Sequence, residues 1–166
     1  MSIQTIIQTL DNLEKLHKSL LELAYKKTEF IKTGDMDSLD QLLKDEQAHV
    51  AAISQLELQR QTVVTDYLRA KGIAPSDTPT VMEVMEAAES PSDQEQLKIS
   101  RNRLLLTVDQ LKFQNDLNQK LTYQSLQFVN LTLDMLKPHP EQINYSRTEA
   151  KGDNVNKDKI YFDSQA

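Results

Sequence analysis

The segment from Ser92 to Lys137 contains neither glycine nor proline, and this uninterrupted run limits the possible folds more than any other feature. It is rich in Leu, Gln, Lys and Asn, which is typical of one long helix of about 67 Å at about 1.5 Å per residue. Ser92 and Glu95 form the S-x-x-E pattern of a capping box, which predicts the start of the helix. Pro138 has no backbone donor and disfavours helical geometry in the residue before it, which predicts an end at Lys137.

The apolar residues of this helix fall into two stripes on roughly opposite faces when successive residues are placed about 100° apart. One stripe can pack against the rest of the chain. The other needs a further helix, a second copy or a partner to bury it, although its first part could instead be covered by the short helix that precedes the run or by wide core packing. This second stripe consists of Leu106, Phe113, Leu117, Leu121, Phe128, Leu131 and Met135.

Two amphipathic segments before this run predict a helical hairpin. Residues 2–32 and 37–71 each carry a broad apolar face, and Gly34 lies between them. Glycine readily adopts the left-handed conformation of a helix end, and Asp35 or Asp37 can cap the helix that follows. Because this connection is short, we expect the two helices to be antiparallel.

The segment that links the hairpin to the long helix predicts one short additional helix. Thr80 and Glu83 repeat the capping-box spacing, so about two turns ending near Ala88 are expected. Beyond Pro138 the helical periodicity is lost, and this predicts a mobile tail.

These patterns together predict an all-α fold, an antiparallel bundle of three long helices with a short extra helix between the second and third. The apolar faces are wider than a two-stranded seam, which favours a compact bundle over an extended coiled coil. The bundle is predicted over residues 1–137 and the mobile C-terminal tail over residues 138–166.

Composition excludes several kinds of function. The chain has no cysteine, so a disulfide, a thiol nucleophile and a thiolate metal site are all excluded. The net charge of -6 is concentrated in residues 73–97, which contain acidic residues and no Lys or Arg, and this argues against nucleic acid and acidic membranes as partners. No stretch approaches the about 18 apolar residues of a membrane span, so we expect a soluble cytoplasmic protein without membrane insertion.

Two E-x-x-H patterns, Glu14 with His17 and Glu46 with His49, have the spacing that places a carboxylate and an imidazole on one helix face in di-iron bundles. Such sites also need a glutamate from each of two other helices, and the long helix offers amides and one aspartate at that level instead. We therefore predict no metal, no cofactor and no catalytic residues.

The favoured interpretation of the inward polar residues is a structural polar layer inside the bundle, because inward polar groups are usually partnered and can fix helix register. The predicted layer consists of His17, Glu46, Glu57, Arg60, Asn115 and Asn118.

The sequence resembles the FlgN-type flagellar export chaperones. The run from Gly34 to Leu39, with the Leu and Glu spacing that continues to Gln61, resembles the helical hairpin of that family. The proline-broken acidic segment, the long Leu/Asn/Gln-rich helix and a tail with Asn144-Tyr145-Ser146 and a closing Phe162 to Ala166 follow the same pattern. Ser146 stands where the family usually has Gly or Asp.

This resemblance implies a non-enzymatic cytoplasmic chaperone that binds hook-filament junction proteins before secretion and delivers them to the flagellar type III export machinery. The end of the long helix and the tail would hold the client, and Tyr145 would lie near the contact with the export gate or ATPase complex. The predicted partner-binding residues are Leu117, Leu121, Phe128, Leu131, Met135, Tyr145, Ile160, Tyr161 and Phe162.

Two other interpretations remain open at this stage, a helical structural adaptor without a secreted client and a di-iron bundle enzyme. The free protein could be a monomer or a dimer.

Overall fold

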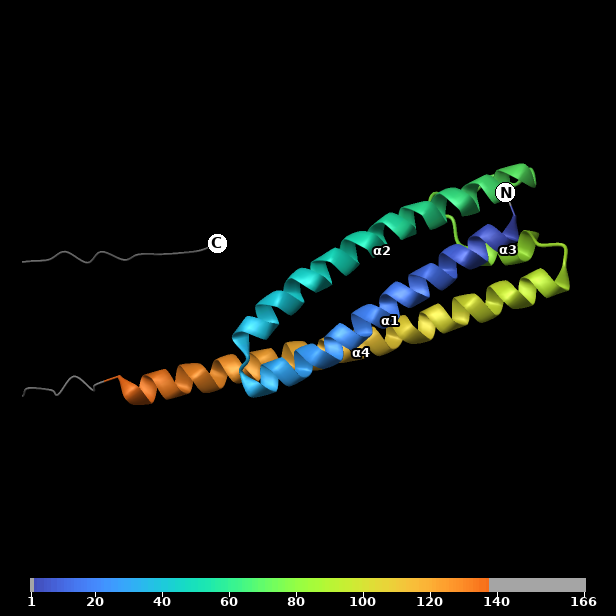
Figure 1. The fold of residues 1–166 in the computed structure, drawn as a ribbon. Coiled ribbons are helices and arrows are strands. Elements are labelled where there is room, and N and C mark those ends of the chain that lie inside the picture. The colour runs from blue at the N-terminus through green and yellow to red at the C-terminus, as the bar shows by residue number, and fades with distance from the viewer. Residues whose placement is uncertain (1, 138–166) are drawn as a thin grey trace, which may run out of the picture.

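The computed structural model describes residues 2–137, and every regular element in this part of the chain is a helix (Figure 1). This confirms the all-α prediction. The predicted mobile tail falls outside the described residues and stays a prediction, as does the division of the chain at residue 137. The helices are α1 (Ile3–Thr33), α2 (Met36–Ala70), α3 (Val81–Ala87) and α4 (Pro91–Leu136).

The ends of α1, α2 and α3 follow the local signals in the sequence. Gly34 has a φ of 69°, the left-handed conformation that ends α1 at low steric cost. Asp35 rather than Asp37 caps α2, because its side chain accepts a hydrogen bond of 3.1 Å from the Ser38 amide. At α3, the Glu83 carboxylate accepts from the Thr80 amide at 2.6 Å while Thr80 Oγ1 accepts from the Glu83 amide at 3.4 Å, which completes the predicted capping box.

The predicted capping box at Ser92 is wrong. The N-cap of α4 is Ser90, and its side chain makes no capping hydrogen bond. Pro91 occupies the first helical turn, where its missing N–H removes a donor that would have no partner within the helix, and its fixed φ suits the helix. The helix therefore begins before the capping-box motif.

Helix α1 lies between α2 and α4 and packs along both of them (Figure 1). It runs antiparallel to α2, because Ser19 pairs with His49 and the later Lys27 pairs with the earlier Glu46. It runs parallel to α4, because Asp11 pairs with Arg103 and the later Thr28 pairs with the later Asn118. The Cα atoms of α2 and α4 stay more than 8 Å apart. The arrangement therefore differs from the expected compact bundle, in which each of the three long helices would touch the other two.

Helix α3 fills the space between α2 and α4 at one end of the molecule, where it contacts both. The main hydrophobic core forms there because all four helices contribute to it. A smaller core of Leu20, Leu21, Ala24 and Leu111 lies further along α1. The main core consists of Ile3, Ile6, Ile7, Leu10, Val63, Val64, Tyr67, Leu68, Val81, Val84, Ala88 and Leu97.

Candidate partner-docking site

The second apolar stripe of α4, which we call the outer stripe, lies on solvent-facing surface along most of the helix. Leu106 and Phe113 are exposed, so the alternative in which α3 or the core covers the first part of the stripe is wrong. Phe128 is 70% exposed and Met135 is 74% exposed. Leu117 and Leu121 are better covered, but neither is fully buried. The stripe therefore offers apolar surface to a partner.

The last turns of α4 extend beyond the hairpin formed by α1 and α2 (Figure 1). Helix α1 ends at Thr33, and among the described residues its hydrogen bonds to α4 reach Asn118 and no further. We call residues 123–136 the overhang. Every large apolar side chain of the overhang is at least 50% exposed, namely Tyr123, Leu126, Phe128, Val129, Leu131, Leu133, Met135 and Leu136.

The overhang is physically unusual because its apolar residues face several directions, and apart from Tyr123 and Leu126 at its start no other described helix lies against them. Contiguous exposed apolar surface commonly marks an interaction site. The overhang is therefore a candidate docking surface.

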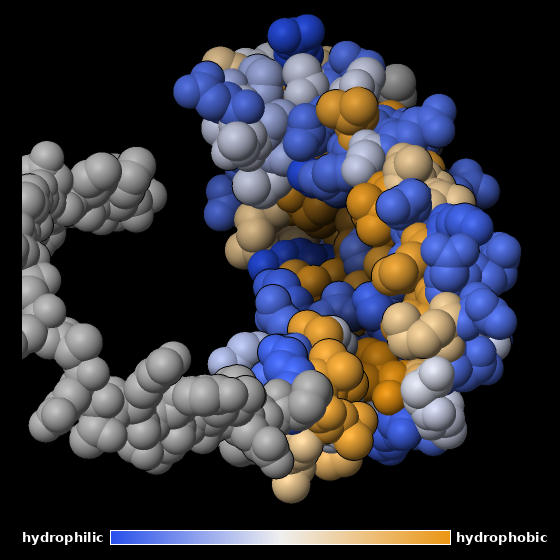
Figure 2. All heavy atoms as spheres, turned by 90° about the vertical axis from the view of Figure 1, so that its left-hand side faces the viewer, coloured by the Kyte–Doolittle hydropathy of each residue, from blue (hydrophilic) through white to orange (hydrophobic). Residues whose placement is uncertain are grey.

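A groove separates α2 from α4 at the end of the molecule opposite α3. It has a volume of about 900 Å³, and its floor is formed by α1. Figure 2 views the molecule from this end and shows hydrophobic side chains inside a hollow. We call it the α2–α4 groove. Its aliphatic lining consists of Leu20, Ile31, Leu39, Leu43, Val50 and Leu126, and Tyr123 also lines it.

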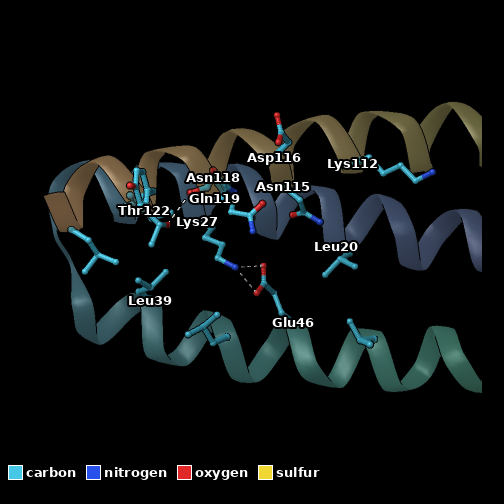
Figure 3. Close-up of a pocket in the computed structure, with 15 residues that line it drawn as sticks. Leu20, Lys27, Leu39, Glu46, Lys112, Asn115, Asp116, Asn118, Gln119 and Thr122 are labelled. Atoms are coloured by element: carbon cyan, nitrogen blue, oxygen red, sulfur yellow. Dashed lines mark hydrogen bonds and ion pairs between the residues drawn. The ribbon is translucent and has the colours of Figure 1, made fainter. Parts of the chain in front are cut away.

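An ion pair crosses the groove between its floor and one wall. Lys27 Nζ of α1 lies 2.9 Å and 3.3 Å from the two carboxylate oxygens of Glu46 of α2 (Figure 3). Both side chains are mostly covered, so water screens this pair less than it screens a surface pair. The pair ties α2 to α1 at the level where α2 has no contact with α4.

Three buried polar residues join α1 to α4 just below the groove. Thr28 Oγ1 donates to the Asn118 side-chain oxygen at 2.5 Å and accepts from Gln114 Nε2 at 2.6 Å. Asn118 Nδ2 also donates to the Ala24 carbonyl at 2.8 Å. Asn118 of the predicted layer is thus buried, together with Thr28 and Gln114, which the sequence analysis did not single out although both stand at the helical spacing of the buried face.

The predicted polar layer does not form one level. His17 Nδ1 lies 2.8 Å from the carbonyl of Leu13 on its own helix, whereas Glu46 pairs with Lys27 nearly three turns further along α1. Asn115 is exposed and lines the groove. The inward residues therefore lie at different heights in the bundle, and His17 and Glu46 each pair locally.

Glu57 and Arg60 form the predicted pair on α2. Arg60 donates to both Glu57 carboxylate oxygens, at 2.6 Å and 2.9 Å, and its other nitrogen donates to the Pro79 carbonyl at 3.1 Å. The hydrogen bonds from Arg60 are the main reason that the pKa of Glu57 lies below its ordinary value of 4.5, and partial burial opposes this shift. The pair therefore connects α2 to the residue before the α3 capping box.

The histidines of the two E-x-x-H patterns have protein partners. His49 Nε2 lies 2.7 Å from Ser19 Oγ, and its Nδ1 lies 2.8 Å from the Asp45 carbonyl. Glu14 is buried and pairs with Lys18 at 2.7 Å and with Arg103 at 3.4 Å. Within residues 2–137 no group of three or more His, Asp or Glu side chains is placed to hold a metal ion.

Four of the predicted partner-binding residues, Tyr145, Ile160, Tyr161 and Phe162, lie outside the described residues. None of the helices in the described part is long and apolar enough to cross a membrane.

Comparison with known proteins places the chain in one protein family. The family described as "FlgN protein" matches residues 1–151. A protein of Bacillus subtilis (strain 168) named "Uncharacterized protein YvyG" is 34% identical over 167 residues, which cover 100% of both chains. No solved structure matches the chain.

Proposed function

Because this chain belongs to the FlgN family, we propose that it is a flagellar export chaperone whose clients are hook-filament junction proteins. The family is one of chaperones and not of enzymes. In this proposal the protein binds terminal helical segments of its clients in the cytoplasm and delivers them to the export gate or ATPase complex. Tyr145, outside the described residues, is the proposed contact with the export gate.

The observation that supports the proposal most is the overhang of α4 with the distal part of the outer stripe. Phe128, Leu131 and Met135 recur at spacings of three and four residues, so their side chains lie on one face of the helix. All three are at least 60% exposed. Leu117 and Leu121 extend the same face toward the hairpin.

The energetics suit a client that docks as an amphipathic helix. Fully burying one such side chain contributes about 1.5 to 3 kcal/mol. Three of them together contribute about 4.5 to 9 kcal/mol. Micromolar affinity corresponds to about 8.2 kcal/mol after the cost of ordering is subtracted, so the client helix needs further contacts, which Leu117 and Leu121 on the same face can supply. Binding would also cover an apolar helix of the client, which otherwise promotes aggregation before export.

The test replaces Phe128 and Leu131 with serine and measures the affinity for terminal fragments of junction proteins by calorimetry, together with the melting temperature. Because both side chains are exposed, melting should change little while the affinity falls by about tenfold or more. The matched control replaces Met36 and Leu58 of α2, which are similarly exposed, with serine, and it should bind normally.

Two results would contradict the proposal. A collapse of the melting temperature would show that the outer stripe is core. Failure of the unaltered protein to bind any junction-protein fragment would favour a helical adaptor without a secreted client.

A further inference from the structure

The space between α2 and α4 is filled by α3 at one end of the molecule and is open at the other end. At one end α3 inserts Val81 and Val84 between the two helices, and both side chains are buried. At the other end the α2–α4 groove has apolar walls from the same two helices, and no described segment fills it. The fold therefore already shows that a short apolar insert can occupy the space between these helices.

We propose that residues Ile160 to Phe162 of this same chain bind in the α2–α4 groove. This proposal concerns the protein without its partners, and it does not depend on which client the protein carries.

The position of the chain end supports this occupant. Leu126, at the near end of the groove, lies ten residues before the end of α4 at Leu136, a distance of about 15 Å, and Lys112 at the far end lies about 36 Å away. The residues from Pro138 to Lys159 can span up to about 73 Å at about 3.3 Å per residue. The segment can therefore turn back and reach any part of the groove.

The chemistry of the segment also matches the groove. Ile160-Tyr161-Phe162 is the only run of three consecutive large apolar residues after Pro138. The groove combines aliphatic walls with the side-chain amides of Asn115 and Gln119, which Figure 3 shows on α4 beside the groove. The aliphatic walls suit Ile160 and Phe162, and an amide can pair with the hydroxyl of Tyr161, which has an apolar ring and a polar tip.

The covalent link favours this segment over a second copy or a free peptide. A short tether gives the tail an effective concentration on the order of millimolar at the groove, so a few apolar contacts are sufficient for occupancy. A second copy at micromolar concentration would need a much larger interface. Occupancy by the tail would cover Leu126, where the groove meets the overhang.

The absence of cysteine from the sequence permits a direct test by disulfide formation. One variant carries Leu43→Cys in the groove wall and Tyr161→Cys in the tail. The matched control carries Gln41→Cys and Tyr161→Cys, because Gln41 is an exposed α2 residue two positions away that does not line the groove. The full-length proteins are oxidised at low concentration, and the products are separated by non-reducing electrophoresis and identified by mass spectrometry.

The intramolecular disulfide should form about tenfold faster in the Leu43→Cys variant than in the control. Adding Ile160→Ser and Phe162→Ser should remove most of this difference, because the tether is unchanged but the apolar contacts are lost. Equal rates in the variant and the control would overturn the proposal, and so would a rate that these serines leave unaltered. Disulfide-linked dimers in place of the internal product would assign the groove to a second copy.

Discussion

Thr28 of α1 and Asn118 of α4 form a buried hydrogen bond of 2.5 Å, and this pair sets the register of the two parallel helices near the α2–α4 groove. Asn118 also donates to the Ala24 carbonyl, so a single side chain holds α4 to two successive turns of α1. Helix α1 continues to Thr33, five residues beyond Thr28. Among the described residues, the pair is therefore the last hydrogen-bonded contact between α1 and α4 before the overhang.

Replacing Asn118 with alanine should lower the free energy of unfolding by about 1 to 3 kcal/mol, because buried hydrogen-bonding groups of α1 lose a partner. Urea denaturation followed by circular dichroism measures this change. Asn115→Ala is the control, since Asn115 is exposed, and it should change stability by no more than about 0.5 kcal/mol. Equal effects of the two substitutions would show that Asn118 does not join the helices.

Leu97→Ala should destabilise the protein by about 2 to 5 kcal/mol, because Leu97 is fully buried in the main core. Leu105→Ala on the same helix removes the same atoms from a partly exposed position and should cost much less. Thermal and urea unfolding of the two variants provide the comparison. A similar loss in both would mean that α4 is rotated relative to the core described above.

The Glu57–Arg60 pair should make stability depend on pH. The pKa of Glu57 is lowered in the folded protein, chiefly by the hydrogen bonds from Arg60. The folded state therefore binds this proton less readily than the unfolded state does, so the contribution to stability is present above the ordinary pKa of 4.5 and is lost as the pH falls through the lower folded value. The Glu57 side chain is 42% exposed, so solvent screening limits the contribution to about 1 kcal/mol or less.

Urea titrations of the unaltered protein and of Glu57→Gln test this dependence. Their unfolding free energies should differ most near about pH 7, and the difference should shrink as the pH falls below 4.5. A difference that stays constant over this range would show that the carboxylate charge does not contribute.

Replacing His17 and His49 together with leucine should leave client affinity unchanged, because both rings are bonded within the hairpin and neither lies on the outer stripe. Calorimetry with a junction-protein fragment measures the affinity, and circular dichroism verifies the fold. Weaker binding by a folded variant would assign one of these histidines to the client site.

Local sequence signals were sufficient for most of the helix boundaries. Gly34 and Asp35 mark the turn of the hairpin, and Thr80 with Glu83 marks α3, because each forms its structure through contacts within a few residues. The predicted start of α4 was too late in the chain, because Pro91 and the capping-box motif at Ser92 are two competing local signals for a helix start. Helical periodicity also identified the exposed outer stripe, since it depends only on residue spacing.

The partners of the inward polar residues depend on contacts between helices, which periodicity does not specify. Asn115 and Asn118 have the same side chain and lie three residues apart, yet Asn118 is buried against Thr28 while Asn115 is exposed. This difference follows from where α1 crosses α4. The sequence by itself determined the helices, most of their ends and their apolar faces, whereas the tertiary structure alone decided that α2 and α4 remain apart and leave a groove, because α3 fills the space between them at one end only.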